Sequence, residues 1–166
     1  MSASTRAFEI DVTSLLAGVP ASMTIDDVEA ALSPRGLTLG VARDSGAIDR
    51  GRAPIGTWLE EGAPGARSAF ADPADHLVAG LEATLTNGAR LDVRPSPRRA
   101  VGPDLTALVL SAARRFASID YAWLRVHRVD ARRHALPLPV GVDLDPPLEL
   151  GEAALLDAIE RELRRS

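Results

Sequence analysis

The stretch His76-Leu-Val-Ala-Gly-Leu-Glu-Ala-Thr-Leu-Thr-Asn-Gly-Ala-Arg-Leu-Asp-Val93 decides the fold of this chain. Apolar and polar residues alternate along residues 76–84, and Leu91 and Val93 resume the alternation after Asn87-Gly88. An Asn-Gly pair between two such segments is the strongest short-range signal for a β-hairpin, because both residues tolerate the positive φ angles of its turn. We therefore predict two antiparallel strands joined at Asn87-Gly88.

The segment before this hairpin predicts two strands, a helix and a third strand. Residues 8–12 alternate between apolar and charged side chains, and residues 15–20 form an apolar run. Thr24 can cap the start of a helix, since its hydroxyl oxygen can accept a hydrogen bond from a backbone amide of the first turn. Residues 37–41 follow as a strand, and we interpret the succession as a compact β-α-β unit.

The segment after the hairpin predicts two helices and one long strand. A helix opens at Pro103 and runs through Ala113, and residues 119–126 read as a strand buried on both faces over part of its length. Four prolines punctuate a linker with a short strand around residues 140–144, and a final helix covers residues 152–165. This order of elements predicts an α+β fold, with a mixed or antiparallel sheet flanked by helices.

Composition bounds the class of protein. The chain has 166 residues, of which 46% are hydrophobic, so it can bury one core with at most a short appendage. No apolar run reaches the length that a membrane helix needs, and the polar first residues lack a signal-peptide core, so we expect a cytoplasmic protein without a membrane partner. A net charge of −4 makes a nucleic-acid partner unexpected.

Several chemistries are excluded or disfavoured by residue type. There is no cysteine, and all 19 basic residues are arginine, which excludes a thiolate nucleophile, a P-loop lysine and a Schiff-base lysine. The three histidines lack metal-ligand spacing, so we expect neither a metal site nor a catalytic side chain. The adjacent pairs Asp26-Asp27 and Glu60-Glu61 point apart on regular elements, and we interpret them as a helix cap and a solvated turn.

A glycine-rich loop is the candidate binding feature. Residues 54–68 offer several unhindered amides, the hydroxyl of Thr57 and the guanidinium of Arg67, which are groups that hold a pyrophosphate. A tight surface loop anchored by Trp58 explains the same residues without a ligand. Both interpretations stay open on the pattern alone.

Four motifs in a fixed order carry a resemblance to a known family. They are Gly36-Leu-Thr-Leu-Gly40, then Ile55-Gly56 with Gly62-Ala-Pro-Gly-Ala-Arg-Ser68, then Asp75-His-Leu-Val-Ala-Gly-Leu-Glu82 with the Asn87-Gly88 turn, and then Gly102-Pro-Asp-Leu105. Over residues 8–126 the chain resembles the FAD-linked oxidases of the PCMH type, a family that includes glycolate oxidase FAD subunits and alkyl-dihydroxyacetone-phosphate synthases. It is most similar to the second FAD-binding subdomain of that family.

The resemblance implies a domain division and a cofactor site. Residues 8–130 would form the second subdomain, and residues 131–166 would form a linker, a strand and a helix left from the catalytic cap. FAD would lie between this subdomain and a first one that the chain does not match. The residues that the resemblance places at or near the pyrophosphate are Gly56, Thr57, Gly62, Gly65, Ala66, Ser68, His76 and Ala79.

The chain departs from the family pattern at the flavin. Thr57 stands where the family has the second of two paired glycines, and its Cβ narrows the approach to a phosphate. In the family's flavin-contacting stretch, two glycines are replaced by Arg114 and Ala117. These departures indicate a degraded site, and we expect the chain to be inactive alone.

Three functional hypotheses follow. The first is a truncated, flavin-binding half-module or pseudo-enzyme that needs a partner chain for oxidase or dehydrogenase activity. The second is a non-catalytic protein without flavin that self-associates, or binds a partner, through the former inter-subdomain face. The third is an anion-binding module that uses Arg67, Arg114 and Arg115.

Overall fold

The computed structural model describes residues 6–41, 50–63, 77–95, 106, 109–110, 115–129 and 150–165, without the side chains of residues 50 and 150–156. A five-stranded sheet has the order β1-β2-β6-β4-β5. Every neighbouring pair in it is antiparallel. Its strands are β1 (Glu9–Asp11), β2 (Leu16–Pro20), β6 (Ala117–Arg125), β4 (Val78–Leu85) and β5 (Arg90–Val93).

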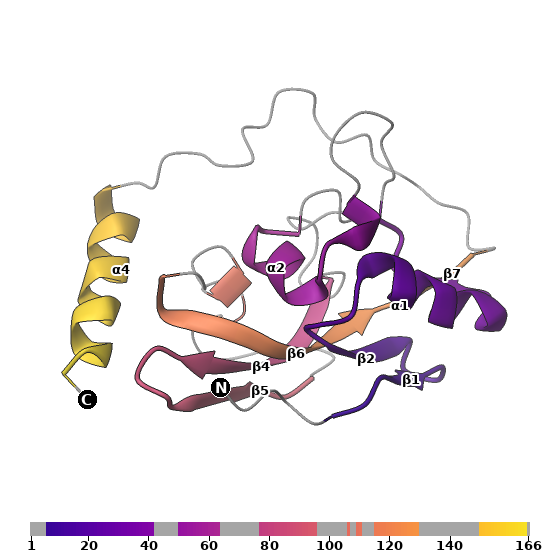
Figure 1. Ribbon diagram of the computed structural model, residues 1–166, viewed down its shortest axis with the longest axis horizontal. Coiled ribbons are helices and arrows are strands. Elements are labelled where there is room, and N and C mark those ends of the chain that lie inside the picture. The colour runs from indigo at the N-terminus through magenta and orange to yellow at the C-terminus, as the bar shows by residue number, and fades with distance from the viewer. Residues whose placement is uncertain are drawn as a thin grey trace.

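Helices α1 (Ile25–Leu32) and α2 (Ile55–Glu60) lie over one face of this sheet (Figure 1). Helix α4 (Leu150–Leu163) stands beyond the end where β4 turns into β5 (Figure 1). The α+β class, with an antiparallel sheet and flanking helices, is therefore confirmed. The proposed division between residues 130 and 131 stays a prediction, because residues 130–149 lie outside the described part.

The core lies between the sheet and the two helices. Helix α1 buries Ile25, Val28 and Leu32, and α2 buries Trp58 and Leu59. The sheet side chains that meet them are Ala17, Val19, Leu81, Ala83, Ile119, Ala122 and Leu124. Because successive strand residues point to opposite faces, Tyr121 and Trp123 lie opposite Ala122 and Leu124, on the face of β6 away from the helices. The register of the β4–β6 pairing shifts between Glu82 and Ala83, so Ile119 faces the helices although it is two residues from Tyr121.

Two of these elements follow from local signals between neighbouring residues. The hairpin forms at Asn87-Gly88, where Gly88 has a φ of 83° and Asn87 Oδ1 accepts a hydrogen bond from the amide of Ala89. Thr24 caps α1 as predicted, through two reciprocal hydrogen bonds. The backbone amide of Asp27 donates to Thr24 Oγ1, and the backbone amide of Thr24 donates to Asp27 Oδ2. Both features depend on residues within a few positions of each other.

The predicted β-α-β unit is correct in order but wrong as a unit. The third strand is only β3 (Leu37–Thr38), and it pairs with β7 (His127–Arg128) in a separate two-stranded sheet. Two short 3-10 turns, η1 (Ser33–Arg35) and η2 (Arg50–Arg52), complete the described elements upstream of α2. The predicted strand near residues 140–144 and most of the helix expected over residues 103–113 lie outside the described residues, although residues 106 and 109–110 are helical.

Candidate functional site

Helix α2 begins as a continuation of backbone pairing. Pro54 forms an isolated bridge with Thr24, the amide of Ile55 donates to the carbonyl of Met23 at 2.8 Å, and the amide of Gly56 donates to the carbonyl of Ala21 at 2.9 Å. A Cβ at Gly56 would meet the Cβ of Ala21 at 2.9 Å. Gly56 is therefore a close-packing residue whose amide is already bound within the chain, and it does not donate to a pyrophosphate in this arrangement.

Two of the proposed pyrophosphate residues are exposed. Thr57 lies in the first turn of α2, and Gly62 follows the helix with a φ of 81° and open space where a Cβ would project. Trp58 between them is 1% exposed, which confirms that it anchors this segment to the core. The surface beside α2 can thus offer one hydroxyl and one unhindered glycine to a ligand, a partial fit to a dinucleotide.

The other proposed residues are buried or lie outside the described part. Ala79 is 4% exposed within β4, so it belongs to the packed interior. Gly65, Ala66, Ser68 and His76 lie outside the described residues.

Glu60 corrects the expectation of a solvated turn. Its side chain is partly buried, and Oε1 accepts a hydrogen bond from the amide of Ile119 at 3.1 Å. Ala117, two residues before Ile119, pairs with Leu85 at the start of β6. The position where the resemblance expects a flavin-contacting glycine is therefore an ordinary strand residue here, and Arg114 lies outside the described residues.

Arg115 does not stand free for an anion. Its Nε contacts Glu160 Oε1 at 2.7 Å and its terminal nitrogen contacts Asp157 Oδ1 at 2.7 Å, and these carboxylates raise the pKa of Arg115. A hollow of about 430 Å³ lies between the hairpin turn, Arg115 and α4. It is lined by Thr86, Asn87, Arg115, Glu160, Leu163 and Arg164. The anion-binding hypothesis thus loses Arg115, while Arg67 and Arg114 lie outside the described residues.

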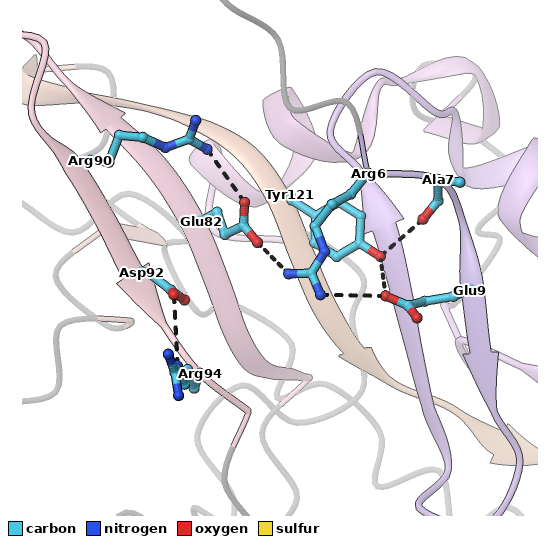
Figure 2. Close-up of polar contacts among 8 residues, drawn as sticks. All are labelled: Arg6, Ala7, Glu9, Glu82, Arg90, Asp92, Arg94 and Tyr121. Atoms are coloured by element: carbon cyan, nitrogen blue, oxygen red, sulfur yellow. Dashed lines mark hydrogen bonds and ion pairs between the residues drawn. The ribbon is translucent and has the colours of Figure 1, made fainter.

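The sheet face away from the helices carries a charged and aromatic cluster that sequence reasoning missed. The guanidinium of Arg6 lies 5.0 Å from the ring centre of Tyr121 and 5.4 Å from that of Trp123. It pairs with Glu82 and also reaches Glu9 at 3.7 Å, as Figure 2 shows. Alternation along β4 and β6 could place Glu82 and Tyr121 on this face, but not side by side.

Tyr121 is the buried centre of this cluster. Its hydroxyl lies 3.1 Å from both the carbonyl of Ala7 and Glu9 Oε1, so its single proton is shared between two acceptors. Burial, followed by the hydrogen bond to Glu9, raises the pKa of Tyr121. The hydroxyl therefore stays protonated and keeps the N-terminal segment against the sheet.

In the described part of the chain, no three His, Cys, Asp or Glu side chains are grouped so that they could hold a metal ion. Over the same residues, no helix has the length and apolarity required to span a membrane.

Comparison with known proteins finds similarity in sequence and in fold. No protein-family model matches the chain. It is 28% identical over 109 residues to the uncharacterized FAD-linked oxidoreductase YgcU of Escherichia coli, from strain K12 and from strain O157:H7. The aligned part is 66% of this chain and 22% of that protein.

The fold matches two structures of alkyldihydroxyacetonephosphate synthase, in space groups P212121 and P1. The TM-scores are 0.58 and 0.57 at 20% sequence identity, over 73% of this chain and 21% of each of those chains. This chain therefore spans about a fifth of the length of the proteins that it matches. It is similar in sequence to an FAD-linked oxidoreductase and shares its α+β fold with part of alkyldihydroxyacetonephosphate synthase, which confirms the resemblance to the FAD-linked oxidases.

Proposed function

We propose that this chain forms one lobe of a flavin site and binds FAD only together with a second lobe, supplied by another polypeptide or by a further part of a longer one. The observation that carries the proposal is the coverage, since the match takes in most of this chain but only 22% of the FAD-linked oxidoreductase. FAD, when bound, supplies the redox chemistry, while protein groups bind and orient it. The assembled site would act as an oxidase or dehydrogenase.

In this proposal the chain contributes contacts to the pyrophosphate. Thr57 offers a hydroxyl and Gly62 lets a ligand approach the backbone closely, because nothing lies within 4 Å of the space where its Cβ would be. Gly65, Ala66 and Ser68 follow on the same loop in the sequence, with His76 beyond it. Gly56 supports the site by letting α2 pack closely on Ala21, and no side chain is assigned a catalytic role.

The test is flavin retention by the purified full chain, alone and after co-expression with the products of its flanking genes. We expect no bound flavin alone and a stoichiometric amount in one of the complexes, measured by flavin absorbance after gel filtration. A chain that holds FAD tightly by itself, or one that takes up none with any neighbour, contradicts the proposal.

Two glycines offer a matched pair of variants for this experiment. Gly62 and Gly36 both have a positive φ and open space at the Cβ position, so Gly62→Val and Gly36→Val strain the backbone alike. Only Gly62 lies on the proposed loop. We expect Gly62→Val to lower flavin retention in the complex and Gly36→Val to leave it unchanged.

A second function, from a different class, is a non-catalytic interaction protein that has lost flavin. It is favoured by the engagement of the Gly56 amide with Ala21 and by Ala117, which pairs regularly with Leu85. The chain would then self-associate, or bind a partner, through the face that meets the first subdomain in the family. Light scattering that shows a flavin-free oligomer supports it, and flavin uptake by any complex rejects it.

A further inference from the structure

A guanidinium group already occupies a defined place on the sheet face away from the helices. Arg6 lies over the rings of Tyr121 and Trp123, within the distance at which an aromatic face attracts a cation. We propose that Tyr121, Trp123, Glu82 and Glu9 form a binding site for an arginine side chain of a partner polypeptide, and that Arg6 fills this site when no partner is bound.

The walls of the site belong to the sheet and not to Arg6. Tyr121 and Trp123 stand on β6 with ring centres 5.8 Å apart and planes at 77°, an edge-to-face pair. Glu82 lies directly opposite Tyr121 in the β4–β6 pairing. Because paired strands carry these three side chains, we expect the site to persist when Arg6 leaves it.

Gly18 supplies the space in which Tyr121 sits. A Cβ at Gly18 would meet the Tyr121 hydroxyl oxygen at 2.2 Å and the Trp123 ring at 3.0 Å. The neighbouring strand β2 therefore presents bare backbone beneath both aromatic side chains. This lets Tyr121 lie fully buried, with its ring held below the cation.

The charges of the site match one monovalent cation. The side chain of Glu82 is 14% exposed, and it pairs with Arg90 at 3.4 Å as well as with Arg6. Without Arg6, the carboxylates of Glu82 and Glu9 and the guanidinium of Arg90 leave one net negative charge. A planar guanidinium can stack on a ring and donate to two carboxylates at once, whereas an ammonium acts as a point charge, so the site favours arginine over lysine.

Arg6 is positioned to be replaced. Its side chain is 48% exposed although it is paired, so an incoming group can reach the site from solvent. Because Arg6 is tethered to β1, its effective concentration at the site is on the order of millimolar. A partner that makes additional contacts around the site can bind tightly enough to displace it. The N-terminal segment would then act as an internal competitor for the partner.

The test uses the full chain with Arg6→Met, which keeps an unbranched stem and removes the charge. The probe is N-acetyl-arginine amide, and the readout is the NMR shift of the Trp123 indole N–H, assigned with Trp123→Phe. We expect saturable binding in the millimolar range, and about twofold weaker binding to the wild-type chain, because tethered Arg6 competes at a similar effective concentration. N-acetyl-citrulline amide, which has a similar shape without charge, should not bind.

Two carboxylates give matched controls in the Arg6→Met background. Glu82→Gln should weaken arginine binding by about tenfold, since it removes the less exposed of the two carboxylates. Asp92→Asn, on the adjacent strand and paired with Arg94 at 3.9 Å, should leave binding unchanged. Equal effects of the two variants, or no saturable shift in folded Arg6→Met protein, overturn the proposal and leave Arg6 as a purely structural clamp.

If Arg6→Met does not fold, Arg6→Lys replaces it as the background because it keeps a cation in place. Arginine amide should then still displace the lysine, and lysine amide should compete more weakly. A folded Arg6→Lys chain that does not respond to arginine amide overturns the proposal. None of these measurements uses FAD, so their outcome is independent of the flavin-lobe proposal.

Discussion

The side-chain carboxylate of Glu60, the last residue of α2, accepts a hydrogen bond from the backbone amide of Ile119 in β6 at 3.1 Å. At the other end of the helix, the carbonyl of Ile119 lies 3.4 Å from the place where a Cβ of Gly56 would be. A helix of six residues is not stable in isolation. These contacts, together with the burial of Trp58 and Leu59, hold α2 against the sheet and position the exposed Thr57.

Replacing Glu60 with Ala should destabilise the fold by about 1–3 kcal/mol, because the amide of buried Ile119 loses its acceptor. Glu60→Gln retains a side-chain oxygen and should cost less than about 1 kcal/mol. Chemical denaturation followed by far-UV circular dichroism measures both. Equal losses for the two variants would show that the charge, and not the acceptor, matters at this position.

Elements defined by neighbouring residues could be predicted from the sequence. The Asn87-Gly88 turn and the Thr24 cap require contacts over two or three positions, and both are confirmed. Strand β1 ends at Asp11, one residue earlier than predicted. The backbone amides of Thr13 and Ser14 donate hydrogen bonds to Asp11 Oδ1, and these bonds stabilise a turn directly after the strand.

Contacts between distant segments could not be predicted. Leu37 pairs with Arg128 across two short strands, and Glu60 accepts a hydrogen bond from Ile119, 59 positions away. No local sequence pattern identifies the partner in either case. The site residues show the same division. Thr57 and Gly62 lie near the two ends of the short helix α2, where exposure can be expected from the sequence. The hydrogen bond from the Gly56 amide to the carbonyl of Ala21 cannot be expected without knowing which segments pack together.

Gly18 and Tyr121 should be energetically coupled. Gly18→Ala places a Cβ 2.2 Å from the Tyr121 hydroxyl oxygen, and we expect a loss of about 1–3 kcal/mol from overpacking. In a Tyr121→Phe background the clashing atom is gone, so the same substitution should cost clearly less. Denaturation midpoints of the four proteins in this double-mutant cycle give the coupling, and strictly additive losses would contradict this role for Gly18.

Asp11 should titrate below its ordinary value. Hydrogen bonds from Ser14, first from its side chain and then from its backbone, lower the pKa of Asp11 from 3.8. A lowered carboxyl pKa gives stability that is fully present above pH 3.8 and is lost as the pH falls through the folded value. NMR titration of the Asp11 carboxyl measures it directly. Ser14→Ala should raise the midpoint towards 3.8, while Thr13→Ala, which retains the backbone donor, should leave it unchanged.

Arg115 should attach α4 to the rest of the protein. Its guanidinium binds Asp157 and Glu160 on one face of the helix, and Ile159 and Leu163 pack against the core. Arg115→Ala should therefore speed amide hydrogen exchange along residues 157–163. Because these carboxylates are at least partly exposed, added salt should move the wild-type rates in the same direction.

Arg165 provides the control for α4. It pairs with Glu162, three positions away near the same end of the chain, so Arg165→Ala removes an ion pair without removing a link to the sheet. Exchange along residues 157–163 should stay close to the wild-type rates in this variant. If Arg115→Ala and Arg165→Ala give the same rates, the packing of Ile159 and Leu163 alone holds the helix, and the ion pairs of Arg115 contribute only local charge neutralisation.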